Sequence, residues 1–264
     1  MKKFELTTEF ITNALGKKLF RIKALVEFGS VKAGELGGYA EKEENISQDG
    51  NAWVSGDARV YGNAWVSGDA RVYGDAWVHD NAKVFGNAEV YGDTEVSGDA
   101  LVYGNAKVYG DAEVSDNAKV FGNAEVYGDA LVFGNAWVSD DAWVYGDAKV
   151  FGNAWVSGDA LVFDNAKVYG DAEMYGDAKV SDNAEVSGDA DYALVKGFGT
   201  EFRCTTFYRD KNKKIMVNCG CFHGDLEAFR KQVKETRSGK IAKEYLMIAD
   251  LMEYHFTSED SSDE

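Results

Sequence analysis

The chain has 264 residues, a formal net charge of −17, three cysteines and no proline. This charge disfavours direct binding to nucleic acid, which needs a basic surface, and no apolar run is long enough to cross a membrane. An odd number of cysteines fits a reducing compartment better than a disulfide framework. We therefore expect a soluble, cytoplasmic protein.

Residues 1–44 are predicted to form an N-terminal cap. Phe4–Ile11 and Lys18–Ile22 alternate like two strands of a hairpin. Residues 36–38 and 45–46 are expected to be degenerate first coils of the repeat that follows, because the end of a repeat array exposes unpaired strand edges and needs an atypical terminal unit. The two glycines at 37 and 38, which precede several glutamates, also allow a functional loop here.

Residues 45–188 are dominated by one repeat. From Asn51 to Gly188 a six-residue unit with the consensus [N/D]-A-x-V-[S/Y/F]-G occurs 23 times without insertion or deletion. Alternation within the unit predicts a short strand with Ala and Val on one side and x and Ser or an aromatic on the other. Gly and Asn or Asp supply the bend. Side chains as small as Ala and Val fit the interior of a narrow three-sided prism.

This pattern resembles the hexapeptide-repeat family, whose members fold as left-handed parallel β-helices. The resemblance covers all 23 units and departs from the commonest spelling of the family in placing Gly at the corner. It implies an all-β solenoid with 18-residue triangular coils. It leaves the function open, because this fold carries sugar and acyl transferases, carbonic anhydrases and inert scaffolds.

With 18 residues per coil, every third unit stacks on the same face. The first face then carries charges of alternating sign and a column of aromatic residues: Tyr73, Tyr91, Tyr109, Tyr127, Tyr145 and Phe163. The second face is mixed and includes Trp77 and His79, and the third is the most apolar. Stacked aromatics and opposite charges are the neighbours that a ladder favours, so this sorting supports the 18-residue coil.

All six tryptophans occupy the outward third position of the unit: Trp53, Trp65, Trp77, Trp137, Trp143 and Trp155. Their rings either stack on neighbouring coils or lie beneath the terminal units, or they form a protein interface, where exposed aromatic residues concentrate binding energy. We predict that Trp65, Trp137, Trp143 and Trp155 bind a partner. The apolar third face also leaves room for a homo-oligomer.

One predicted edge of the prism carries six carboxylates in succession: Asp57, Asp75, Asp93, Asp111, Asp129 and Asp147. The edge that begins at Asn63 is mostly Asn, which would fill these bends equally well. Stacked carboxylates repel one another, so their use here suggests a function. The alternative is that Asp suits the turns and keeps a long rod soluble. We expect this edge to bind a basic groove on a partner or to collect divalent cations.

Residues 189–264 are predicted to form a small α+β unit that seals the far end of the array or docks on its flank. The expected elements are strands at Tyr192–Phe198, Cys204–Tyr208 and Lys214–Phe222, a helix from Asp225 to Thr236 and a helix from Ile241 to Phe256. The expected buried residues are Leu226, Phe229, Val233, Tyr245, Ile248, Leu251 and Met252. The acidic tail, Ser258–Glu264, is expected to be disordered.

Residues suited to catalysis or metal binding are sparse. An acyltransferase of the hexapeptide family needs a general base, usually His, and a projecting loop, whereas the array has only His79 and no such loop, so we expect His79 to be a surface residue. Cys219, Cys221 and His223 would share one side of a strand near Cys204, where they either bind zinc or pack in the core. We assign no catalytic residue, no metal and no cofactor.

The sequence thus predicts a non-catalytic binding protein with an acidic, aromatic surface. The terminal units resemble those of uncharacterised hexapeptide-array proteins of phages and prophages. By analogy with acidic solenoids of the pentapeptide class, which imitate DNA, we expect a phage or mobile-element inhibitor. Its partner would be a host protein with a basic nucleic-acid-binding groove, such as a defence nuclease. The alternatives are an acyltransferase-like enzyme and a structural spacer or virion component.

Overall fold

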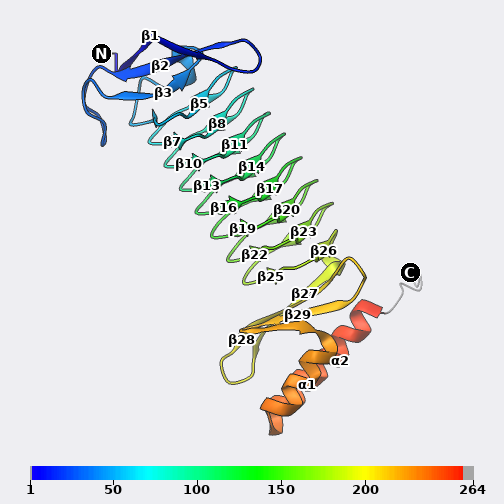
Figure 1. The fold of residues 1–264 in the computed structure, drawn as a ribbon. Helices are drawn as coiled ribbons and strands as arrows, with labels where there is room; N and C mark the ends of the chain where they lie inside the picture. The colour runs from blue at the N-terminus through cyan, green and yellow to red at the C-terminus, as the bar shows by residue number, and fades with distance from the viewer. Residues whose placement is uncertain (1, 258–264) are drawn as a thin grey trace.

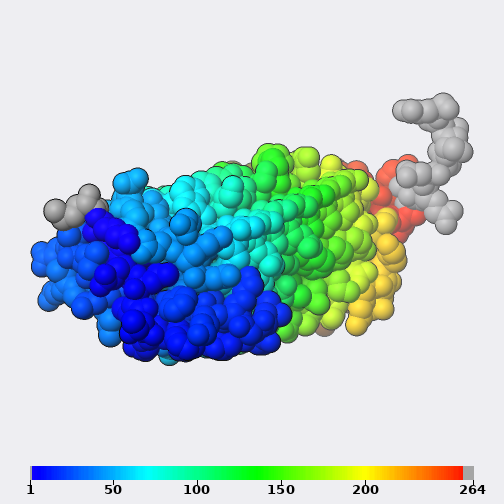
Figure 2. Space-filling view, turned by 90° about the horizontal axis from the view of Figure 1, so that it is seen from above, coloured from blue at the N-terminus to red at the C-terminus, as the bar shows by residue number. Residues whose placement is uncertain are grey.

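The computed structural model describes residues 2–257; the predicted tail, Ser258–Glu264, lies outside the described residues. The chain forms a rod of stacked coils with an N-terminal unit at one end and a C-terminal unit at the other (Figure 1). Figure 2 shows the same rod as coils lying between the blue N-terminal unit and the yellow-to-red C-terminal unit. No helix among residues 2–257 is both long and apolar enough to cross a bilayer.

The repeats form a parallel β-solenoid with three strands and 18 residues per coil, as predicted. Val90 pairs with Val108, and Val108 pairs with Val126. The second and fourth positions of the repeat point into the prism, where side chains such as Ala100 and Val102 are fully buried. Burial of these small side chains along the whole rod, together with the backbone ladders, holds the coils together.

Three sheets result from the stacking. The eight-stranded sheet contains β4 (Trp53–Val54), β7 (Arg71–Gly74), β10 (Glu89–Gly92), β13 (Lys107–Gly110), β16 (Glu125–Gly128), β19 (Trp143–Tyr145), β22 (Leu161–Val162) and β25 (Lys179–Val180). The seven-stranded sheet contains β6 (Trp65–Val66), β9 (Lys83–Val84), β12 (Leu101–Val102), β15 (Lys119–Val120), β18 (Trp137–Val138), β21 (Trp155–Val156) and β24 (Glu173–Met174).

The eleven-stranded sheet joins the N-terminal unit to the solenoid. Its solenoid strands are β5 (Arg59–Val60), β8 (Trp77–Val78), β11 (Glu95–Val96), β14 (Glu113–Val114), β17 (Leu131–Val132), β20 (Lys149–Val150), β23 (Lys167–Val168) and β26 (Glu185–Val186). Its other strands are β1 (Phe4–Thr12), β2 (Lys18–Ala24) and β3 (Leu36–Ala40). The chain visits the eight-, eleven- and seven-stranded sheets in that order in every coil.

The corners of the coils need glycine for two reasons. Gly110 has φ of +79°, a left-handed conformation that costs other residues about 1–2 kcal/mol. A Cβ atom at this position would also lie 2.9 Å from the backbone nitrogen of Gly128 in the next coil. Asp replaces glycine at five corners with φ of 56–58°, which is consistent with its tolerance of the left-handed region.

The N-terminal unit closes the first coil, and the predicted hairpin is confirmed. Strands β1 and β2 pair antiparallel, and β3 pairs with both β2 and β5. The buried side chains of Lys3 and Asn45 donate hydrogen bonds to carbonyl groups of the first coil, at Ala52 (2.9 Å) and Ala64 (2.9 Å). Residues 43–45 form a short 3-10 helix, η1 (Glu43–Asn45). Carbonyl groups that lack a preceding coil are thus satisfied by the cap.

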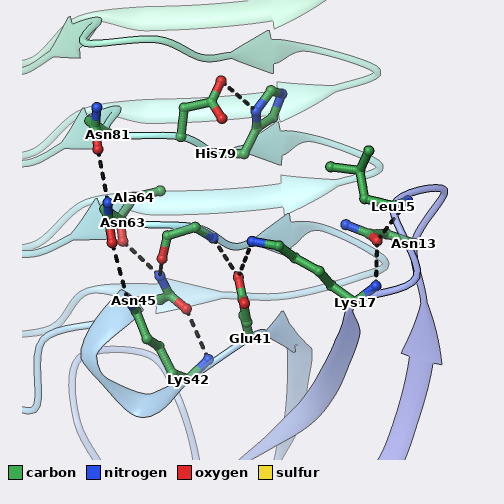
Figure 3. Close-up of polar contacts among 12 residues, drawn as sticks. Asn13, Leu15, Lys17, Glu41, Lys42, Asn45, Asn63, Ala64, His79 and Asn81 are labelled. Carbon is green, nitrogen blue, oxygen red and sulfur yellow. Dashed lines mark hydrogen bonds and ion pairs between the residues drawn. The ribbon is translucent and has the colours of Figure 1, made fainter.

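Packing explains the two glycines and one of the glutamates in this unit. A Cβ atom at Gly37 would lie 2.5 Å from the carbonyl oxygen of Val54. The Glu41 carboxylate accepts a hydrogen bond from Lys17 (3.2 Å; Figure 3) and another from the backbone of Gly62 (2.7 Å). These residues therefore attach the cap to the solenoid.

The C-terminal unit consists of η2 (Asp189–Asp191), β27 (Tyr192–Phe198), β28 (Arg203–Arg209), β29 (Ile215–Cys219), β30 (Phe222–Asp225), α1 (Leu226–Thr236) and α2 (Gly239–Thr257). The Asp225 carboxylate caps α1 by accepting a hydrogen bond from the backbone of Ala228 (2.7 Å), as predicted. The unit seals the last coil, since Tyr192 and Tyr208 pack in the same core as the repeats. Thr206 also accepts a hydrogen bond from the backbone of Lys179 (2.9 Å).

Two predictions for this unit are wrong. The single strand expected at Lys214–Phe222 is split into β29 and β30 by a turn in which Gly220 has φ of +62°. Leu251, expected in the core, is 58% exposed, whereas Phe256 is buried. The helical face of α2 that packs on the sheet is therefore defined by Tyr245, Ile248, Met252 and Phe256.

Candidate binding surface

The six aspartates form one straight row, which we call the acidic ridge: Asp57, Asp75, Asp93, Asp111, Asp129 and Asp147. The ridge follows the edge between the eight-stranded and eleven-stranded sheets, and each of its residues is exposed. Aromatic rings in the adjacent column are 4.7–5.1 Å apart from coil to coil, which gives the spacing of the row.

Asparagine ladders occupy the other two edges of the prism. Asn63 donates a hydrogen bond to Asn81 (3.1 Å; Figure 3), and Asn105 donates to Asn123 (2.9 Å). Where an aspartate interrupts these ladders it acts as an acceptor, as Asp141 does for Asn123 (2.9 Å). A row of carboxylates cannot form such a ladder, because an ionised carboxylate has no proton to donate.

Most of the acidic ridge lacks a counter-charge. Within residues 2–257, Asp57 is the one ridge residue with an ion pair, to Arg21 at 3.6 Å. The other five ridge carboxylates have no ion pair or side-chain hydrogen bond in that part of the chain. The ridge is therefore an exposed row of negative charge that is largely unpaired within residues 2–257.

A column of stacked rings, the tyrosine stack, lies directly beside the ridge. It comprises Tyr73, Tyr91, Tyr109, Tyr127, Tyr145 and Phe163, with successive planes within 7° of parallel. Partial burial, reinforced by the nearby Glu89 carboxylate, raises the pKa of Tyr73 to about 12. The Tyr109 hydroxyl donates a hydrogen bond to Glu125 (3.0 Å), which also pairs with Lys107 (3.0 Å). Ionisation of these phenols within the folded stack is therefore disfavoured.

The tryptophans divide between structural and exposed positions. Trp53 is buried against the cap residues Phe4 and Phe28, and Trp77 is covered by the Arg59 guanidinium at 4.9 Å. The remaining four are exposed by 37–42%: Trp65, Trp137, Trp143 and Trp155. The four tryptophans predicted to bind a partner are thus those with accessible rings.

The acidic ridge and the exposed tryptophans do not form one site. Trp65, Trp137 and Trp155 lie on the seven-stranded sheet, which is the face opposite the ridge in a three-sided prism. Only Trp143 lies on a sheet that borders the ridge. The rings of Trp137 and Trp155 contact each other at 5.7 Å. The ridge and the tryptophans of the seven-stranded sheet are therefore separate surfaces.

His79 is held among acidic and aromatic neighbours on the eleven-stranded sheet. Its ring stacks on Tyr61 at 4.8 Å, and its two nitrogens lie 3.2 Å from Asp80 and 2.9 Å from Glu95. No loop of the array lies beside it, since the repeats run without insertion.

The cysteines do not share one side of a strand, so that prediction is wrong. Cys219 ends β29, Cys221 lies in the following turn, and His223 belongs to β30. Burial, aided by the negative charge of Asp177, raises the pKa of Cys204 to about 11. Among residues 2–257 no group of three or more His, Cys, Asp or Glu is placed to hold a metal ion.

The tyrosine stack is bounded by hollows that we did not predict. The aromatic position is taken by Ser55 in the coil before Tyr73 and by Ser181 in the coil after Phe163. Each serine lines a hollow, of about 420 Å³ at the N-terminal end and about 400 Å³ at the C-terminal end. In the sequence, the two hollows could have been predicted from the serines that replace an aromatic residue at each end of the column.

Fold and surface together define a β-solenoid repeat protein. A family model described as the YdcK β-solenoid repeat matches residues 52–68, 64–80 and 124–140, segments that each span almost one coil. The chain is similar to that repeat in these coils. No curated protein matches the chain significantly.

Proposed function

We propose that this protein is a non-catalytic binding protein whose acidic ridge occupies the basic groove of a nucleic-acid-binding protein. Membership of the hexapeptide-repeat family, a phage or mobile-element origin and inhibition of a host defence protein are parts of the same proposal. The observation that carries it is the unbroken row of six exposed carboxylates, five of them without a counter-ion in residues 2–257.

The ridge presents regularly spaced negative charges, as a nucleic-acid strand does, although they are more widely spaced. A DNA strand carries one charge per about 3.4 Å of helix axis, and the ridge carries one per coil, at 4.7–5.1 Å. Exposed carboxylates such as Glu113 extend the negative potential beside the row. Opposed charge of this kind steers association and makes the complex sensitive to salt.

The choice of residue on this edge supports a binding role. On the other two edges Asn forms a hydrogen-bonded ladder, for example between Asn135 and Asn153 (3.0 Å). Asp at the same bends gives up that ladder and adds repulsion between neighbours. A sequence that retains the less stable choice at six consecutive coils is consistent with selection for charge.

The test is affinity capture from host cells with three proteins. The ridge variant replaces all six ridge aspartates by Asn. The scattered variant makes the same number of Asp→Asn changes on the other two edges, at Asp69, Asp99, Asp141, Asp159, Asp171 and Asp177. Because both variants change the net charge equally, only the position of the charge differs between them.

We expect the wild-type protein and the scattered variant to capture the same nucleic-acid-binding protein, and the ridge variant to lose it. Duplex DNA should compete with the captured complex, because both would occupy one groove. Capture that persists in the ridge variant, or that DNA does not affect, would rule out this function. Protection of the fold against heat by coenzyme A would instead favour the acyltransferase alternative.

A further inference from the structure

The hollow at the C-terminal end of the tyrosine stack has an open aromatic face. One face of Phe163 stacks on Tyr145, with ring centres 5.1 Å apart and planes 7° from parallel. The next position of the column is Ser181, which has no ring and whose hydroxyl bonds to Tyr208 (3.1 Å). The second face of Phe163 therefore lines the hollow of about 400 Å³.

The C-terminal unit supplies the opposite wall of this hollow. The hairpin of β29 and β30 packs over the last coil, and Phe222 and His223 line the hollow from that side. The space thus lies between the ring of Phe163 and the residues of the hairpin. A flat group placed against Phe163 would continue the stack at the position that Ser181 leaves empty.

The charged groups of the hollow are mainly acidic. Asp164 and Asp182 line it, and both are corner residues in the left-handed conformation, with φ of 58° and 56°. Asp182 pairs with His223 (2.6 Å), whereas Asp164 has no ion pair or side-chain hydrogen bond in residues 2–257. Lys179 also lines the hollow; its side chain is positively charged and exposed. The free acceptor is therefore the Asp164 carboxylate.

Asp164 lies on the same edge as the acidic ridge, one residue before Asn165 of the ridge column. Both Asp164 and Asp182 follow strands of the eight-stranded sheet, β22 and β25, and precede strands of the eleven-stranded sheet. They thus lie on the same edge as the ridge, beyond Asp147. A basic chain that follows the ridge would reach the hollow at its end.

We propose that this hollow binds the guanidinium group of an arginine side chain presented by the partner. A guanidinium is planar, stacks on aromatic faces and offers donors only, in a fork that matches a carboxylate. A nucleotide would instead bring its phosphates close to the acidic rod, where like charges repel. The identity of the arginine donor rests on the proposed function, because a basic groove is what would supply it.

The probe for this inference is N-acetyl-arginine amide, titrated into the full chain by isothermal calorimetry. We expect binding to the wild-type protein and about tenfold weaker binding to Asp164→Asn, the loss expected for one charge-assisted hydrogen bond. Asp140→Asn is the matched control, since Asp140 is also a left-handed corner residue (φ 58°) but lies on another edge. It should bind the probe like the wild-type protein.

Replacing Lys179 should have the opposite effect on the affinity for the probe. Lys179→Ala should tighten binding of the probe several-fold, because it removes a like charge from the hollow. Weak binding that Asp164→Asn leaves unchanged, or equal binding of the uncharged citrulline analogue, would overturn the inference. Circular dichroism of each variant excludes a trivial loss of fold.

The outcomes separate this inference from the proposed function. The ridge variant leaves Phe163 and Asp164 intact and should still bind the probe. Probe binding without capture of a basic partner would support the hollow and contradict the function. Capture without probe binding would support the function and contradict the hollow.

Discussion

Replacing the acidic ridge by asparagine should stabilise the protein. Adjacent coils are 4.7–5.1 Å apart beside the ridge, and two charges about 5 Å apart in water repel by about 0.8 kcal/mol at low ionic strength. Salt at physiological concentration reduces this to about half. Side chains that turn away from each other lower it further.

The new asparagines should also form hydrogen bonds. On the other two edges each Asn donates to the next coil at 2.8–3.1 Å, as Asn153 does to Asp171 and Asn117 does to Asn135. The ridge column continues with Asn165, so six substitutions would place asparagine in seven consecutive coils. Exposed hydrogen bonds of this kind contribute about 0.5 kcal/mol each. Six such bonds and five relieved repulsions give an expected total gain of up to about 7 kcal/mol in the free energy of unfolding at low salt.

Urea denaturation of the wild-type protein, the ridge variant and the scattered variant at low and high salt measures this gain. The ridge variant should be the most stable, and its advantage over the wild-type protein should shrink as salt screens the repulsion. The scattered variant should gain less, because several of its aspartates already accept ladder hydrogen bonds. A ridge variant less stable than the wild-type protein, or an advantage that salt does not change, would refute this reasoning.

Three further predictions concern single positions. Gly110→Ala should lower the free energy of unfolding by more than Gly16→Ala does. Both glycines have positive φ (+79° and +76°), but only Gly110 faces the backbone of the next coil. Chemical denaturation of the two variants measures the difference. Burial lowers the pKa of Lys3 to about 8, below its value in the unfolded chain. The free energy of unfolding should therefore rise by up to about 2 kcal/mol between pH 8 and 9.5. The substitution Lys3→Met should remove this rise. Burial raises the pKa of Tyr73 to about 12. Ultraviolet titration should therefore show that the tyrosines of the stack ionise at a higher pH in the folded protein than in the urea-unfolded protein, and the free energy of unfolding should fall above pH 10. Coincident titration curves for the two states would contradict this.

The strict repeat made the solenoid predictable. Ala and Val at the second and fourth positions define the inside of each strand, and the unbroken count places Tyr91 beside Tyr109 and Asp93 beside Asp111. The burial of Ala and Val and the pairing of residues 18 positions apart follow from this spacing alone. The cap hairpin and the α1 helix were predictable from alternation and from the capping residue Asp225.

The parts that depend on docking were not predictable in the same way. The alternation of Lys214–Phe222 continues through Gly220, and nothing local distinguishes a long strand from the tight hairpin that packs on the last coil. Leu251 has the spacing of a core residue, but the sheet covers a different side of α2. The hollow beside Phe163 arises because that hairpin overhangs Ser181.

The dependence of partner affinity on salt tests the central claim most directly. The dissociation constant of the captured complex should rise steeply with salt for the wild-type protein and the scattered variant, since both retain the ridge. The ridge variant should bind much more weakly and with a shallower salt dependence. Equal weakening of the ridge and scattered variants would show that the overall charge of the rod, and not the row of aspartates on one edge, determines binding.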